Sequence, residues 1–110
     1  MSVREQAETL AARLWPDGWG DTSFPPEAQR RRNNLVALAA NGAWAAIGMI
    51  VERMAEDGWM FAMQETSAMN LPWEAGFYSG GSRDGEGHGD TPLEAVLSAA
   101  LAAVGEKGDG

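Results

Sequence analysis

The sequence of 110 residues contains no cysteine, only one lysine and only one histidine. Without cysteine the chain can form no disulfide, no iron–sulfur cluster and no thiol nucleophile, so we expect a cytosolic protein and not a disulfide-stapled secreted scaffold. A lone His88 supports neither a zinc site of the His/Cys type nor a catalytic serine–histidine pair. The glycine-rich phosphate loop of nucleotide-binding enzymes is also missing, and no cofactor is expected.

Positive charge is scarce as well. Sixteen acidic residues stand against eight basic ones, which gives a net charge of −8. This excess disfavours nucleic acid or an anionic membrane as a direct partner, and it favours a protein partner such as a basic, nucleic-acid-binding host complex. The longest uncharged stretch, residues 33–51, is rich in alanine and has Asn41 and Gly42 at its centre. We therefore expect a buried helix there and no membrane span.

A first helix is predicted at the start of the chain. Ser2 and Glu5 have the spacing of a capping box, in which a hydroxyl and a carboxylate satisfy the free amides of a helix start. This helix should end before Pro16, because proline disfavours helical geometry in the preceding residue. The turn that follows carries Trp15 and Trp19, and we expect both rings to pack back on the core.

A second capping box, Thr91 with Glu94, predicts the start of a last helix. This helix, residues 92–104, is almost wholly apolar, so it should be covered on most of its circumference. Gly105 is expected to end the helix and residues 106–110 to form a frayed tail.

The run from Ala28 to Asp57 contains no proline and should be mostly helical. One helix and two helices are both compatible with it, and turn chemistry at Asn41-Gly42 favours a break, with Asn41 as a good cap. After the break, apolar residues at spacings of three and four predict a core-facing stripe: Trp44, Ile47, Val51 and Met54. The polar face would hold Glu52, Arg53, Glu56 and Asp57, with Gly58 at the C-terminal cap.

Two short segments read as strands. Residues 59–63 are aromatic and apolar, which is typical of a strand buried on both faces. Residues 73–78 alternate in polarity, and an antiparallel hairpin with the first strand is the simplest pairing. Residues 79–90 are so rich in glycine and charge that we expect a loop.

These elements predict the α+β class. We expect a small single domain over residues 1–105, with helices packed on a short antiparallel β-hairpin in the order α-α-β-β-α. A chain this small has little material to cover both faces of residues 59–63 and the apolar helix 92–104, so a homodimer is a further expectation.

Two stretches resemble the phage ABA sandwich domain family. Residues 50–59, IVERMAEDGW, are similar to its amphipathic helix ending in Gly-Trp, and residues 89–101, GDTPLEAVLSAAL, are similar to its closing Asp-Thr-Pro entry and Ala/Leu helix. The resemblance covers about residues 41–104, and Gly48 stands where the family usually has an aromatic residue. It implies a phage or prophage origin and a small α+β fold, and it implies no catalytic residue.

Two clusters of charged residues could bind a ligand. Asp84, Glu86, His88 and Asp90 alternate with glycines as in calcium loops, but the acid expected at the twelfth position falls on Ala95, so a solvated loop is the better interpretation and no metal is expected. The basic run Arg30-Arg31-Arg32 has the chemistry to contact phosphate, yet a solvated helix start paired with Glu27 is favoured.

Together these observations predict a non-catalytic, phage-type accessory protein of the host cytoplasm that acts by binding another protein. The expected contact residues are surface acids: Glu52, Glu56, Asp57, Asp84, Glu86 and Asp90. One alternative is an acidic inhibitor or DNA mimic of a host defence complex, similar to an anti-CRISPR protein. A second is a carboxylate-based hydrolase that uses two of Glu65, Glu74, Glu86 and Asp90.

Overall fold

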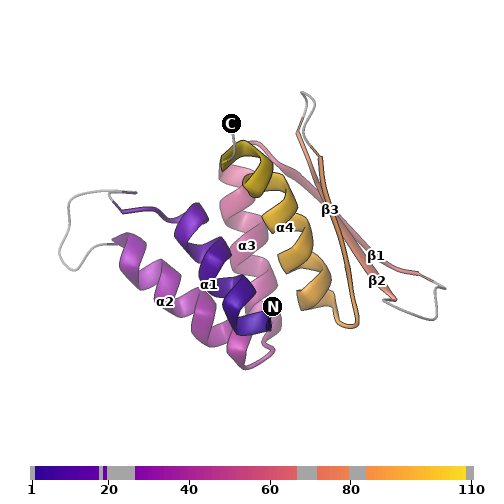
Figure 1. The fold of residues 1–110 in the computed structure, drawn as a ribbon, viewed down its shortest axis with the longest axis horizontal. Helices are drawn as coiled ribbons and strands as arrows, with labels where there is room; N and C mark the ends of the chain where they lie inside the picture. The colour runs from indigo at the N-terminus through magenta and orange to yellow at the C-terminus, as the bar shows by residue number, and fades with distance from the viewer. Residues whose placement is uncertain (1, 18, 20–26, 67–71, 80–83, 109–110) are drawn as a thin grey trace.

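The computed structural model describes residues 2–17, 19, 27–66, 72–79 and 84–108. Residues 67–71, in the connection that we expect over residues 65–72, and residues 80–83 of the predicted loop 79–90 lie outside this range. The elements follow in the order α1 (Val3–Leu14), α2 (Glu27–Ala40), α3 (Trp44–Glu56), β1 (Met60–Glu65), β2 (Trp73–Tyr78), β3 (Asp84–Gly89) and α4 (Pro92–Gly108) (Figure 1).

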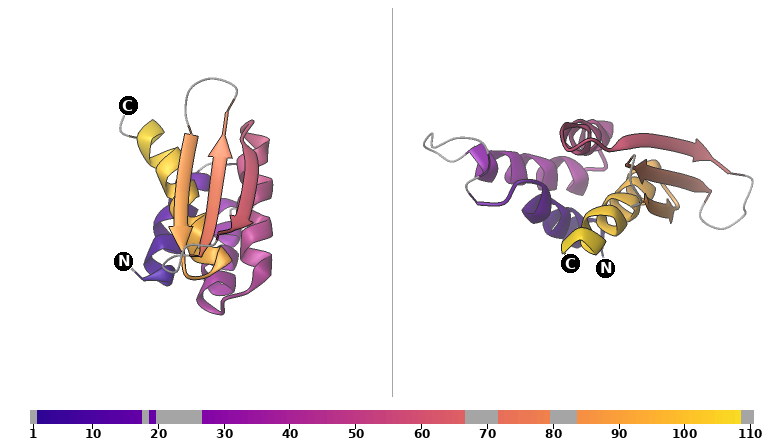
Figure 2. Two further views of the ribbon diagram at one scale, coloured as in Figure 1. Left: turned by 90° about the vertical axis from the view of Figure 1, so that its right-hand side faces the viewer. Right: turned by 90° about the horizontal axis from the view of Figure 1, so that it is seen from above.

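Helix α4 lies against β2 and β3, and the other helices lie on the same side of the sheet. The three strands form an antiparallel sheet in the order β1-β2-β3. In Figure 1, α4 runs along one face of this sheet, and α1 to α3 lie on the same side of the sheet as α4. Figure 2 (left) shows the opposite face of the sheet toward the viewer, with all four helices behind it. The chain thus builds a helical layer on one side of a sheet.

The α+β class is confirmed, but the order is α-α-α-β-β-β-α. The break at Asn41-Gly42 is present, and Gly42 adopts a φ of 66°, which favours glycine. Asn41 does not cap α3, however: its side-chain amide donates to the carbonyl of Ala37 at 2.9 Å and so closes α2. Ala43 precedes α3 with no side-chain cap.

The buried face of α3 is turned from the predicted stripe. Trp44 is 65% exposed, whereas Ile50 is fully buried between Ile47 and Met54. Consecutive helical positions differ by about 100°, so centring the stripe on Ile50 rather than Val51 rotates the whole face. Gly58 follows the helix with a φ of 91°, as its predicted capping role requires.

The end of α1 is held by arginine side chains. The predicted capping box begins this helix, since the Ser2 hydroxyl accepts from the Glu5 amide at 3.1 Å and the Glu5 carboxylate accepts from the Ser2 amide at 3.1 Å. At the other end Trp15 is buried and meets Trp19 edge to face, as expected, with ring centroids 6.5 Å apart. Arg53, predicted on the polar face, is 9% exposed and donates to the carbonyl of Leu14 at 2.8 Å. It thereby satisfies a free carbonyl of the helix end.

Strand β1 is not buried on both faces as predicted. It forms the edge of the sheet, and only Phe61 and Met63 on its inner face pack partly against the core. Met60 on the outer face is 62% exposed. Inner and outer positions alternate along β1, but the sequence does not show this alternation, because the exposed positions carry apolar side chains too.

Residues 84–89 form strand β3, which corrects the prediction of a loop. Gly85, Gly87 and Gly89 occupy the positions of β3 that face α4. The backbones of β3 and α4 approach so closely there that a side chain has no room. A Cβ on Gly87 would lie 2.3 Å from the amide nitrogen of Ala99 and 2.6 Å from the carbonyl oxygen of Ala95. Glycine disfavours strands in general, and here contact with a helix outweighs that preference.

Side-chain size falls across the inner face of the sheet. In register, Phe61 lies beside Phe77 and Phe77 beside Gly85, and the Phe61 and Phe77 ring centroids are 5.0 Å apart. The next row runs from Met63 through Ala75 to Gly87. The inner face therefore carries large side chains on β1 and none on β3, so α4 can pack directly against the backbone of β3.

Helix α4 is covered on most of its circumference, as predicted. None of its side chains between residues 92 and 105 is exposed. Thr91 accepts from the Glu94 amide at 3.2 Å, so the predicted cap is present. The helix continues to Gly108, however, so Gly105 does not end it and residues 106–108 are not a frayed tail. A Cβ on Gly105 would lie 3.3 Å from a guanidinium nitrogen of Arg13.

We predict that Gly87→Ala destabilises the protein by about 2 kcal/mol or more, because the added methyl group collides with the backbone of α4. The matched control is Gly48→Ala in α3, where a Cβ meets nothing within 4 Å. That substitution should stabilise the protein by about 0.5–1 kcal/mol through helix propensity. Urea unfolding followed by circular dichroism measures both, and equal effects would contradict the close contact.

Candidate functional site

One face of the sheet carries the side chains that point away from α4, and we call it the outer sheet face. Strand alternation and register place three rows on it. Its described members are Met60, Ala62, Gln64, Glu74, Gly76, Tyr78, Glu86 and His88. Figure 2 (left) views this face directly, and no described helix covers it. The three strands bring together residues that are up to 28 positions apart in the sequence.

A polar row crosses the outer sheet face. Glu74 on the central strand is flanked by Gln64 on β1 and His88 on β3. The Gln64 amide nitrogen lies 3.4 Å from one Glu74 carboxylate oxygen, and His88 Nε2 lies 3.2 Å from the other. Both oxygens of one carboxylate thus accept from neighbouring strands. Such cross-strand pairs hold the side chains in place on the exposed sheet.

Tyr78 lies flat along the same face. A Cβ on Gly76 would be 2.2 Å from the Tyr78 hydroxyl oxygen, so the missing side chain provides the seat for the ring. A shallow groove of about 170 Å³ remains beside it. Its lining is Ala62, Met63, Gln64, Glu74, Ala75, Gly76 and Tyr78. The groove is open and shallow, which suits contact with a surface better than enclosure of a small molecule.

Charge is distributed unevenly between the two layers. The described part of the outer sheet face carries Glu74 and Glu86 and no arginine or lysine. The arginines whose side chains the structure describes belong to the helical layer: Arg4, Arg13, Arg30, Arg31, Arg32 and Arg53. Among the described residues of this face, a partner therefore meets the carboxylates of Glu74 and Glu86 and no arginine or lysine.

The structure divides the six predicted contact acids between these layers. Glu86 is exposed on the outer sheet face, and Asp90 is exposed just after β3. Asp84 begins β3, with its side chain outside the described part of the structure. The remaining acids, on or directly after α3, are Glu52, Glu56 and Asp57.

Arg53 engages two of the three α3 acids. Its guanidinium lies 3.1 Å from Asp57 and 3.8 Å from Glu56, and the same group lies 5.2 Å from the ring centre of Trp19. These acids hold a buried arginine, so they offer less free charge to a partner than Glu86 does. All three acids are exposed, and Arg53 lies beside Glu56 and Asp57.

The basic run is paired as the favoured interpretation required. Arg30 and Arg31 form ion pairs with Glu27, the latter at 2.8 Å. Arg32 donates to the carbonyl of Trp15 and lies 3.1 Å from Asp17. The contacts of Arg32 anchor the start of α2 to the end of α1, and those of Arg30 and Arg31 lie within α2.

The alternating polar residues of β3 do not form a metal-binding loop. In the strand, Glu86 and His88 point away from the helix at successive outer positions, so they do not wrap around a common point as a calcium loop does. Within the described residues no group of three His, Asp or Glu side chains converges to hold a metal ion.

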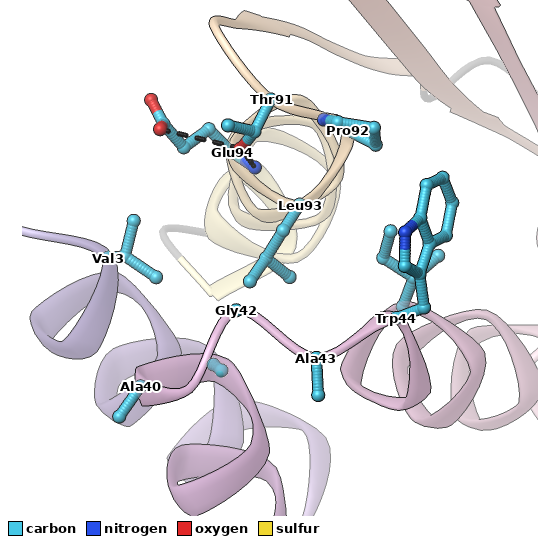
Figure 3. A pocket seen from close by; sticks show the side chains of 11 residues that line it. Val3, Ala40, Gly42, Ala43, Trp44, Thr91, Pro92, Leu93 and Glu94 are labelled. Atoms are coloured by element: carbon cyan, nitrogen blue, oxygen red, sulfur yellow. Dashed lines mark hydrogen bonds between the residues drawn. The ribbon is translucent and has the colours of Figure 1, made fainter.

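A second concave region lies at one end of the helical layer (Figure 3). This groove of about 280 Å³ is bordered by the N-terminal ends of α1, α3 and α4 and by the turn after α2. Leu93 points toward Gly42 in its centre, and the exposed Trp44 stands on its rim. Its polar side chains, Thr91 and Glu94, bond to each other at 3.4 Å in the helix cap. The groove is therefore lined mainly by apolar groups, and its polar side chains already bond to each other.

Sequence reasoning missed the polar row and the role of Tyr78. The available signal was the alternation of glycine with polar residues in 84–89, which matches the alternation in 73–78. Taken as a strand, this pattern places His88 beside Glu74.

Comparison with known protein families, with curated proteins and with solved structures gave no match. The resemblance to the phage ABA sandwich family consequently rests on the two stretches 50–59 and 89–101 alone. In the described part of the chain no helix has both the length and the apolar character needed to cross a bilayer.

We predict that Arg53→Met costs about 2 kcal/mol of stability, because it leaves the Leu14 carbonyl and two acids without their buried partner. The control is Arg30→Met, at an exposed ion pair worth less than about 1 kcal/mol. Thermal and urea unfolding of both variants test the difference. An Arg53 variant as stable as the Arg30 variant would show that the buried contact contributes little.

Proposed function

We propose that this protein is a non-catalytic binding protein that docks a basic protein surface on its outer sheet face. The observation that carries the proposal is the separation of charge between the layers. Glu74 and Glu86 stand on a face without a described cation, while the described arginines lie on the helices. Complementary potentials of this kind steer association and select a partner of opposite charge.

The shape of the outer sheet face supports the same proposal. It is open, and the groove beside Tyr78 is shallow. The Gln64–Glu74–His88 row fixes the central carboxylate before a partner arrives, which lowers the entropy lost on binding. Tyr78 supplies an aromatic ring that is already held in place, a residue type enriched at interface centres.

The partner class we favour is a protein with a basic groove, such as a nucleic-acid-binding host complex. With a net charge of −8, the chain has the charge needed to occupy such a groove in place of nucleic acid. An inhibitor of a host defence complex, similar to an anti-CRISPR protein, is the narrower form of this proposal. A phage-derived accessory protein of the host cytoplasm is supported by the resemblance of two stretches and by the absence of cysteine.

A carboxylate hydrolase would need two acids facing each other across a pocket. Glu74 instead lies beside His88 and Gln64 on an open strand surface. Glu86 belongs to the next row, opposite Gly76. This arrangement supports docking better than hydrolysis.

A lysine decapeptide serves as a defined basic probe for this face. At low salt we expect it to shift the amide NMR signals of β2 and β3 more than those of α1, which also carries exposed acids. The double variant Glu74→Gln/Glu86→Gln should weaken binding roughly fivefold, in line with two exposed ion pairs of about 0.5 kcal/mol each.

The matched control is Glu8→Gln/Glu52→Gln, which removes the same amount of charge from the helical layer. It should leave the affinity for the decapeptide within roughly twofold of the unaltered protein. Equal weakening by both double variants would mean that the probe senses only net charge, and the proposed face would be wrong.

A further inference from the structure

Strand β1 presents an open hydrogen-bonding edge. It is an outer strand of the sheet, and its described strand neighbour is β2 alone. Its sequence, MFAMQE, contains no proline, lysine or arginine, and its only charge is Glu65 at the end. Natural edge strands are usually protected by such residues, so this edge is suited to pairing with another strand. The other outer strand, β3, alternates glycine with charged or polar residues, a composition that disfavours further pairing.

The backbone groups that face this open edge follow from one hydrogen bond. The amide of Thr66 donates to the carbonyl of Pro72 at 2.6 Å and continues the β1–β2 register. In an antiparallel ladder, alternate residues direct their amide and carbonyl to the same neighbour. Residues 60, 62 and 64 therefore face β2, whereas Phe61 and Met63 direct their backbone groups to the open edge.

We infer that β1 pairs antiparallel with β1 of a second copy of this chain, about a twofold axis through Ala62. This register places Phe61 opposite Met63 in both directions, so the outward backbone groups of each residue meet those of the other. All four side chains lie on the inner face, where Phe61 and Met63 are only partly buried within one copy. Each copy thus completes the cover that the other lacks.

The same register also pairs compatible side chains on the outer face and keeps like charges apart. The exposed Met60 comes opposite Gln64, and the two Glu65 carboxylates lie at opposite ends of the pair. Because the twofold axis is perpendicular to the sheet, both outer sheet faces point in the same direction. The pairing would join two three-stranded sheets into one, and this inference does not depend on a basic partner being found.

Salt separates this interaction from the proposed docking. Two copies that each carry −8 repel one another, so added salt should strengthen the dimer. Binding of a basic partner weakens with salt for the opposite reason. Failure of one idea is therefore distinguishable from failure of the other.

The absence of cysteine allows a direct test of the register. Ala62 opposite Ala62 is a non-hydrogen-bonded pair, in which the Cα atoms are about 4.5 Å apart, a separation that a disulfide can bridge. Under mild oxidation we expect Ala62→Cys to give a covalent dimer on a non-reducing gel. The control, Ala45→Cys, alters an exposed alanine on α3 and should stay monomeric on that gel.

Sedimentation equilibrium provides the second readout. The unaltered protein should have twice its chain mass of 11.7 kDa, and Ala62→Lys should have the single mass with an unchanged circular dichroism spectrum, because lysines meet at the axis. An unaltered protein that is monomeric at 0.1 mM would overturn the inference. So would a dimer that persists in Ala62→Lys while Ala62→Cys fails to crosslink, since another face would then hold the copies together.

Discussion

Strand β3 and helix α4 approach so closely that Gly85, Gly87 and Gly89 have no room for a side chain. The facing residues of α4 include alanines at positions 95, 99 and 103, where the small methyl group lets the backbones meet. This contact places α4 against the sheet, where none of its side chains between residues 92 and 105 is fully exposed. Helices α1 and α3 pack on α4, and α2 packs on α1 and α3 and completes the helical layer.

The same alternation that gives glycine to the core gives polar residues to the surface. In β3 the positions between the glycines hold Glu86 and His88, and the register sets His88 beside Glu74 on the central strand. The candidate binding face and the tight packing are therefore two faces of one strand. The size gradient from Phe61 to Gly85 also leaves the bulky inner residues at the open β1 edge, where a second copy would cover them.

Several features that depend on a few adjacent residues were predictable from the sequence, although Asn41 does not cap α3 and Gly105 does not end α4, and features that depend on distant partners were not. The caps at Ser2 and Thr91 and the turn at Gly42 are local, and the structure contains all three. Strand β3 was missed because glycine loses its preference against strands only when a helix lies on it. The burial of Arg53 likewise depends on the end of α1, which is remote in sequence. Glu86 was predicted as a contact residue because it is a surface acid. The row around Glu74 was not predicted, because it depends on the register between β2 and its neighbouring strands.

The close contact between β3 and α4 is tested most directly by NMR distance measurements in the unaltered protein. Nuclear Overhauser effects should connect the α-protons of Gly85, Gly87 and Gly89 with protons of residues 94–103 of α4, above all Gly87 with Ala99. Residues 84–89 should also show the chemical shifts of a strand. An absence of these effects, together with random-coil shifts over residues 84–89, would contradict the account, because the segment would then be the loop that its composition suggests.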